Sequence, residues 1–127
     1  MKIEVSIGEV VDKATILEIK TEKFQDPEKL ENVKNEYNIL KKALKEQGIT
    51  PDSDEYKRLK KINLKLWDIE DNIRKEEAAQ NFSDKFIQLA RDVYLTNDKR
   101  AAIKKEINLK YNSDIIEEKE YVEYKNK

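Results

Sequence analysis

Apolar residues recur at steps of three and four along most of the chain, which is the period of one face of an α-helix. Short polar segments carrying capping residues or proline separate these apolar stripes. The pattern therefore predicts long helices with one apolar face each. The main stripes run from Ile7 to Phe24, from Leu30 to Leu44, from Leu59 to Ile73 and from Phe86 to Val93.

Capping residues predict where the helices begin and end. Ser6 and Glu9 have the spacing of a capping box, in which the Glu9 side chain is expected to reach back to the cap. Pro27 ends the first helix and begins the second, with Asp26 as its N-cap. Gly48 supplies the left-handed residue that closes the second helix. The third helix is expected to start around residue 53 and to reach roughly residue 79.

The fourth stripe meets two polar residues, Thr96 and Arg100, where a continuous helix would require apolar ones. A break with Asn97 as N-cap and Asp98 in the first turn removes this conflict. We therefore expect a fifth helix to begin there and to run through about residue 111.

Both ends of the chain carry weaker signals. Ser113 is expected to cap one further short turn that contains Ile115 and Ile116. Residues 2–5 and 121–127 have strand-like composition, so they are compatible with a short terminal strand pair.

The composition supports an all-α fold. The chain has 127 residues, about the size of one domain, and only two Gly and two Pro, too few for the turns of a sandwich or barrel. We expect a single-domain bundle of four to five helices over residues 1–127. Helices two and three are expected to form a long antiparallel hairpin, against which the others pack.

The charge balance argues against two classes of partner. The 26 cations nearly cancel the 27 acids, so the net charge is -1 and nothing attracts the chain to nucleic acid or to anionic lipid. No apolar run approaches the length of a membrane span, and the N-terminus lacks the pattern of a signal peptide. The expected location is the cytoplasm.

The residue types exclude most enzyme chemistry. Without His or Cys there is no Ser-His-Asp triad and no ordinary zinc site. Gly8 and Gly48 are isolated, so no P-loop or dinucleotide-binding turn is present. Two helical enzyme classes remain: a magnesium-dependent pyrophosphohydrolase and an isomerase of the chorismate-mutase type.

Neither enzyme class is favoured by the pattern. The acids Glu28, Glu31, Asp68 and Asp71 point away from the expected hairpin seam, which indicates solvated carboxylates, so no metal and no cofactor are expected. An isomerase site would need several cations to surround a dianion, whereas surface ion pairing is the ordinary role of such residues. The cations that would have to converge are Lys13, Lys20, Arg100 and Lys104.

The preferred function is a non-enzymatic interaction module that self-associates, as a homo-oligomer and most simply a dimer. The apolar seams are long and narrow, and they require more burial than a small bundle provides internally. Charge is also uneven, because residues 41–61 carry seven cations and four acids, while residues 22–36 and 68–77 together carry ten acids and five cations. Among the aromatic residues, Tyr37 and Trp67 are expected in the core.

Two blocks of sequence resemble a family of short uncharacterised proteins from bacteria, including marine ones, and phages. The first is EVSIGEVVDKATILEIK, residues 4–20. The second runs from Tyr94 to Arg100 and continues with Ile103-Lys104, Ile107-Asn108 and Glu117-Glu118-Lys119. No activity, cofactor or catalytic residue is established for that family, so the resemblance implies a shared fold and no site residues.

The polar residues of the two blocks form our candidate site. They depart from plain Lys and Glu surface usage, and they would meet if the first helix packed beside the last. We expect a polar network or a small anion-binding cleft there; the alternative is ordinary capping and surface pairing. The residues are Glu9, Asp12, Lys13, Thr15, Asn97, Asp98, Arg100, Lys104 and Asn108.

Overall fold

The computed structural model describes residues 1–124 and has an all-α fold, as the sequence predicts. No strand occurs within this range, so the terminal strand pair is not formed by the residues described. None of the four helices is long and apolar enough to cross a membrane, as far as residue 124. The helices are α1 (Ile7–Lys23), α2 (Pro27–Glu46), α3 (Asp54–Ala78) and α4 (Asp84–Lys110).

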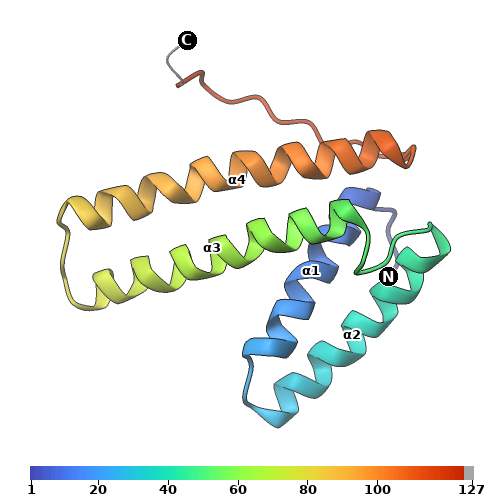
Figure 1. Cartoon of the computed structure of the whole chain (residues 1–127), viewed down its shortest axis with the longest axis horizontal. Helices are drawn as coiled ribbons and strands as arrows, with labels where there is room; N and C mark the ends of the chain where they lie inside the picture. The colour runs from blue at the N-terminus through green and yellow to red at the C-terminus, as the bar shows by residue number, and fades with distance from the viewer. Residues whose placement is uncertain (125–127) are drawn as a thin grey trace.

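The helices pair in a different way from the expected one. α1 packs on α2 and α3 packs on α4, while α1 also contacts both α3 and α4 (Figure 1). The long hairpin of helices two and three is therefore not formed. The physical reason is the wide buried surface of α1, where adjacent residues such as Val11 and Asp12, or Ala14 and Thr15, are all buried. A helix buried on several faces packs between its neighbours, whereas α2 has only one narrow apolar stripe.

The hydrophobic core lies where α1 meets the turn between α2 and α3. Tyr56 is buried there, and its hydroxyl donates to Glu18 Oε2 at 2.6 Å and lies 3.3 Å from the Tyr37 hydroxyl. Burial and the hydrogen bond to Glu18 raise the pKa of Tyr56 far above its ordinary value, so this residue remains a neutral donor. The core cluster comprises Val11, Ala14, Leu44, Ile49, Tyr56, Leu59 and Ile107.

The helix starts follow the capping signals. Ser6 Oγ accepts from the Glu9 amide at 3.2 Å, and Asp26 Oδ1 accepts from the Glu28 amide at 3.0 Å. Gly48 has the left-handed conformation, with φ 78°. The second hydrogen bond of the predicted capping box is not formed, because the Glu9 side chain bonds to Lys104 instead of to the backbone amide of Ser6.

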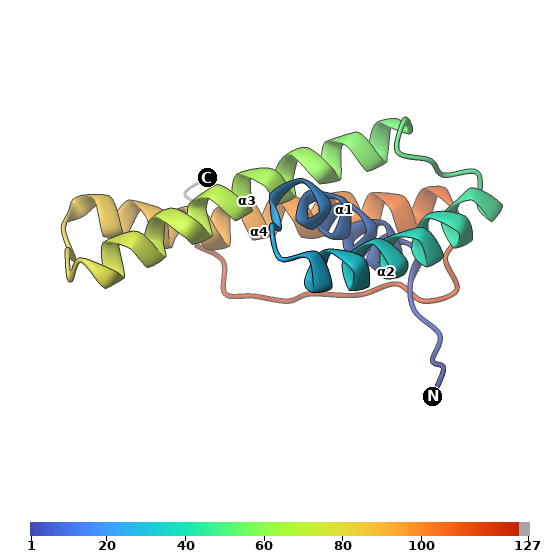
Figure 2. The same ribbon diagram turned by 90° about the horizontal axis from the view of Figure 1, so that it is seen from below.

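The expected break in the last helix is wrong, since α4 continues through Thr96 and Asn97. Thr96 is buried, and Arg100 bonds to Asp12 of α1. The two polar positions are thus accommodated by polar partners and do not end the helix. The short turn expected after Ser113 is also absent from the described chain, where residues 115–124 run back along α4 without regular structure (Figure 2).

One half of the α3 and α4 pair projects beyond the other two helices (Figures 1 and 2). We call residues 70–95 the arm. None of these residues is buried, although several apolar side chains of the arm are half-buried between its two helices. The arm therefore has much less of a core than the rest of the molecule.

Candidate functional site

A buried carboxylate lies at the centre of the interface among α1, α3 and α4. Asp12 is 1% exposed, and its Oδ1 accepts from Arg100 Nε at 2.8 Å and from Asn63 Nδ2 at 2.9 Å. Arg100 Nη2 donates to the other oxygen, Oδ2. A buried charge is strongly unfavourable unless it is paired and hydrogen-bonded, and Asp12 meets both conditions. The hydrogen bond to Asp12 raises the pKa of Arg100, so the guanidinium group stays charged.

Asn63 connects this ion pair to Thr15. Thr15 Oγ1 donates to the carbonyl oxygen of Asp12 at 2.7 Å and accepts from Asn63 Nδ2 at 2.8 Å. Asp12 Oδ1 can only accept, and Thr15 Oγ1 already donates its proton to a carbonyl oxygen. Both atoms therefore require a donor from Asn63, which fixes the orientation of its side-chain amide. Asn63 is not among the nine candidate residues, although its position on the apolar stripe between Leu59 and Leu66 is a sequence signal for it.

Lys104 extends the network toward residues 115–124, which we call the tail. It is 9% exposed, and its Nζ lies 2.7 Å from Glu9, 3.3 Å from Glu117 and 4.0 Å from Asp12. A single ammonium group thus lies among three carboxylates from α1 and the tail. Glu117 is a second network residue that our candidate list did not contain.

The N-terminus of α1 is closed by the C-terminal end of α4. The Gly8 amide donates to Asn108 Oδ1 at 2.6 Å, and the Ile7 amide donates to Ser113 Oγ at 3.0 Å. The first amides of a helix have no partner within that helix, so these bonds satisfy them. The role of Asn108 is therefore to join the two helices.

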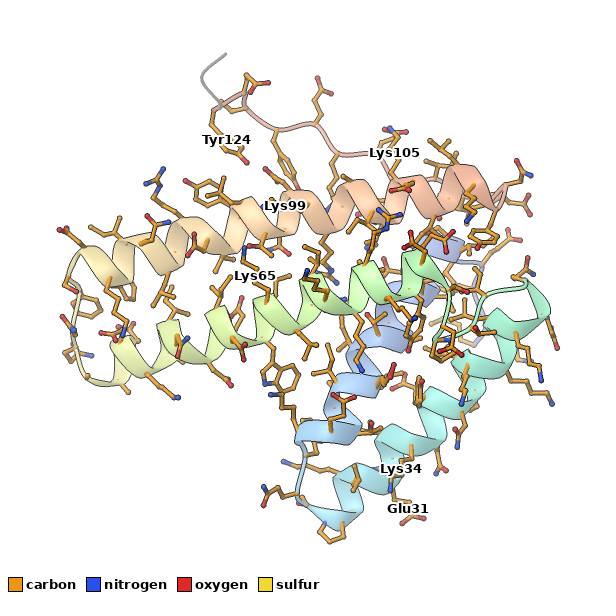
Figure 3. The ribbon with its side chains drawn as sticks, in the orientation of Figure 1. Glu31, Lys34, Lys65, Lys99, Lys105 and Tyr124 are labelled. Atoms are coloured by element: carbon orange, nitrogen blue, oxygen red, sulfur yellow. The ribbon has the colours of Figure 1, made fainter. Side chains whose placement is uncertain are left out.

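Five of the nine candidate residues meet in one network, namely Glu9, Asp12, Thr15, Arg100 and Lys104. Asn97 lies at its edge, with Oδ1 3.5 Å from Arg100 Nη1. Two others lie apart from it. Lys13 faces outward and pairs with Glu36 at 2.8 Å, and Asp98 accepts from the Tyr124 hydroxyl, which lies over α4 in Figure 3.

Two large hollows adjoin the network. One, of about 590 Å³, lies between α4 and the tail and is lined by Arg100, Lys104 and Lys119. Each of these three cations is already paired with a carboxylate, of Asp12, Glu9 or Glu117. Little positive charge is left there to attract a small anion. The second hollow, of about 490 Å³, lies where α1 meets α3 and α4 and contains Asn63 and Arg100.

The residues of the two enzyme alternatives are not brought together. Glu28, Glu31, Asp68 and Asp71 are all exposed, and Glu31 points away from the other helices at the outer edge of α2 (Figure 3). Up to residue 124, no three acidic side chains are grouped so that they could hold a metal ion. The four cations of the isomerase alternative do not converge either. Lys13 pairs with Glu36 of α2, and Lys20 Nζ lies 6.0 Å from the centroid of the Phe24 ring.

Two ion pairs join the tail to α4, Lys104 with Glu117 at 3.3 Å and Lys105 with Glu118 at 2.8 Å. The strength of the first depends on pH. The hydrogen bond from Lys119 and the positive charge of Lys104 lower the pKa of Glu117 below its ordinary value of 4.5. A lowered pKa means that the folded form favours the ionised carboxylate, so the stabilisation is present above pH 4.5 and is lost as the pH falls through the folded pKa.

We therefore expect the tail to be released in acid. In ¹⁵N relaxation measurements, the amides of residues 115–122 should become more mobile as the pH falls from neutral to about 3. The variant Glu117→Gln should already have a mobile tail at neutral pH. A tail that stays rigid in Glu117→Gln would show that this ion pair does not hold it.

Comparisons with known proteins identify the family of the chain but no function. A family model described as a family of unknown function (DUF6165) matches residues 1–125. The comparison with curated proteins finds no match, and the comparison with solved structures finds none. The expected membership of a family without an established function is confirmed. Because the match covers nearly all of the sequence, the chain belongs to the DUF6165 family.

Proposed function

We propose that this protein is a self-associating helical module whose interface is the arm. The observation that supports the proposal is the absence of any buried side chain between residues 70 and 95, in a part of the molecule that the structure describes completely. Two helices with half-buried apolar faces gain stability by packing against a second pair, as in a four-helix bundle. A second copy of the chain supplies such a pair.

The apolar surface of the arm is concentrated near its tip. Phe82 and Ile87 are each 53% exposed, and the Phe82 ring packs edge-on against Phe86 with 5.1 Å between centroids. Exposed aromatic and large aliphatic side chains in one region are typical of interfaces. Antiparallel pairing of two arms would bury both tips against the neighbouring copy.

The charges of the arm are compatible with pairing of identical copies. Residues 70–95 contain six acids and four cations, so two arms approach without strong repulsion. Several of these charges are also neutralised within the arm, since Arg74 pairs with Glu70 at 2.5 Å and Lys85 pairs with Glu76 at 3.2 Å. The surface of the arm is therefore less charged than the composition of the whole chain implies.

The substitution Ile87→Glu should abolish self-association. A carboxylate placed in an apolar interface loses its hydration without a partner, and each 1.4 kcal/mol of lost binding weakens the dimer about tenfold. Sedimentation velocity at high micromolar concentration should give a dimer for the natural chain and a monomer for Ile87→Glu.

The matched control is Ile39→Glu, which places the same charge at an exposed isoleucine of α2, outside the arm. This variant should remain a dimer. A natural chain that sediments as a monomer at high micromolar concentration would refute self-association. Equal loss of the dimer in both variants would refute the arm as its interface.

A further inference from the structure

The groove at the meeting of α1, α3 and α4 has a polar floor and apolar walls. Ile16 and Ile19 of α1 and Leu66 and Trp67 of α3 contribute the apolar side chains. Trp67 is half-buried, with its ring 6.4 Å from that of Phe24, so it lies at this groove and not in the central core where the sequence pattern places it. A groove of about 490 Å³ with such walls has the size and character of a small-molecule site.

Asn63 provides an unused acceptor at the floor of this groove. The residue is 5% exposed, and its Nδ2 is fully engaged with Asp12 and Thr15. Its Oδ1 accepts no hydrogen bond from any residue in the described part of the chain. Every fully buried side-chain oxygen or nitrogen up to residue 124 has a partner, so this oxygen is open to solvent, and the groove is the hollow that Asn63 lines. A ligand that donates a hydrogen bond would complete its bonding.

Arg100, which also lines this groove, provides an unused donor. Its Nε and Nη2 are bound to Asp12, while Nη1 makes only a long contact of 3.5 Å with Asn97 Oδ1. A guanidinium group carries five N–H donors, so at least one on Nη1 remains for a ligand. Because Asp12 holds the guanidinium in place, this donor is presented in a fixed direction.

The remaining polar residues of the groove carry balanced charge. Glu70 and Asp71 contribute two carboxylates, and Arg74 and Arg100 contribute two guanidinium groups. Arg74 is paired with Glu70, whereas the side-chain carboxylate of Asp71 has no ion-pair or hydrogen-bond partner among residues 1–124. A groove with both signs of charge favours a neutral ligand whose groups both donate and accept hydrogen bonds.

We propose that this groove binds a saccharide. A hydroxyl group donates and accepts at once, so adjacent hydroxyls of a sugar ring can donate to Asn63 Oδ1 and to Asp71 while accepting from Arg100. The apolar C–H face of the ring can pack on the indole of Trp67. A carboxylate or phosphate would be repelled by the unpaired carboxylate of Asp71, and a hydrocarbon would leave the Asn63 oxygen without a donor. The proposal does not depend on self-association, although Glu70, Asp71 and Arg74 belong both to the groove and to the base of the arm.

Trp67 makes the test direct, because it is the single tryptophan of the chain. Its fluorescence should change saturably during titration with methyl glycosides of glucose, galactose, mannose and N-acetylglucosamine, or with maltose and cellobiose. Adenosine is titrated in parallel, since a nucleobase is also flat and neutral. In ¹H-¹⁵N spectra, the side-chain amide of Asn63 should shift with the same saturation curve.

Two matched variants locate the site. Asp71→Ala removes an exposed carboxylate of the groove that has no partner, and Asp68→Ala removes an exposed carboxylate one turn earlier on α3, outside the groove. Sugar binding should weaken roughly tenfold in Asp71→Ala and remain unchanged in Asp68→Ala. The proposal is overturned if no sugar gives a saturable response, if adenosine binds and the sugars do not, or if the two variants bind sugar equally well.

Discussion

Replacing Asp12 by alanine should lower the free energy of unfolding by about 3–5 kcal/mol, one of the largest losses available to a single substitution in this chain. The carboxylate is almost completely buried and accepts from both Arg100 and Asn63. Its removal leaves a partly buried guanidinium without a counter-ion and an amide without one of its two acceptors. The loss should be measured by urea denaturation followed by far-UV circular dichroism.

The neighbouring residue gives the control for this prediction. Lys13→Ala breaks an exposed ion pair with Glu36 and should change the free energy of unfolding by less than about 0.5 kcal/mol. Asp12→Asn retains the shape of the side chain and should fall between the two. If Asp12→Ala lost no more stability than Lys13→Ala, the buried network would not be what holds α1 to α4.

The helix positions were predictable because their signals are local. A serine at the start of α1, an Asp-Pro pair before α2 and a glycine after α2 act through bonds to residues at most four positions away. The sequence therefore predicted these boundaries to within a residue or two. None of these signals depends on which helices pack together.

The pairing of the helices was not predictable in the same way. α1 to α4 all have stripes at three and four steps, and stripes of this kind fit almost any neighbour. What selects α1 as the central helix is its second buried face, which is formed partly by Asp12 and Thr15. Both residues are in the predicted candidate site, but a polar residue is buried only if it has a partner. The partner of Asp12 is Arg100, which lies 88 residues away in the sequence.

The predicted break in α4 was wrong for the same reason: the partner of a polar residue lies far away in the sequence. An apolar stripe interrupted by Thr96 and Arg100 is a conflict only when the facing surface is apolar. Here the facing surface of α1 carries a carboxylate, so the arginine on the stripe adds to the interface. The sequence contained both halves of this ion pair, and the candidate list included both, yet helix prediction by apolar periodicity treats each charged residue as solvent-exposed.

The close contact between α1 and α4 depends on Gly8, and Gly8→Ala should be nearly as damaging as the loss of Asp12. A Cβ atom at this position would lie 2.5 Å from the backbone oxygen of Lys104 and 2.9 Å from Asn108 Oδ1. A backbone oxygen within a helix cannot move alone, so α1 and α4 must separate. That separation lengthens the Gly8 to Asn108 hydrogen bond and disturbs the Lys104 to Glu9 pair on the same contact.

The expected loss is about 2–3 kcal/mol, even though alanine is intrinsically better than glycine in a helix by about 1 kcal/mol. Gly48→Ala is the matched control, because no atom lies within 4 Å of its added Cβ and only its φ of 78° is unfavourable for alanine. That variant should lose about 1–2 kcal/mol by backbone strain alone. Arg100 distinguishes the two mechanisms, because its Nε–H group donates from α4 to Asp12 of α1. Its side-chain Nε–H signal should shift in Gly8→Ala and stay in place in Gly48→Ala. An unshifted Arg100 signal in a destabilised Gly8→Ala would mean that the helices had not separated, so that the loss has another cause.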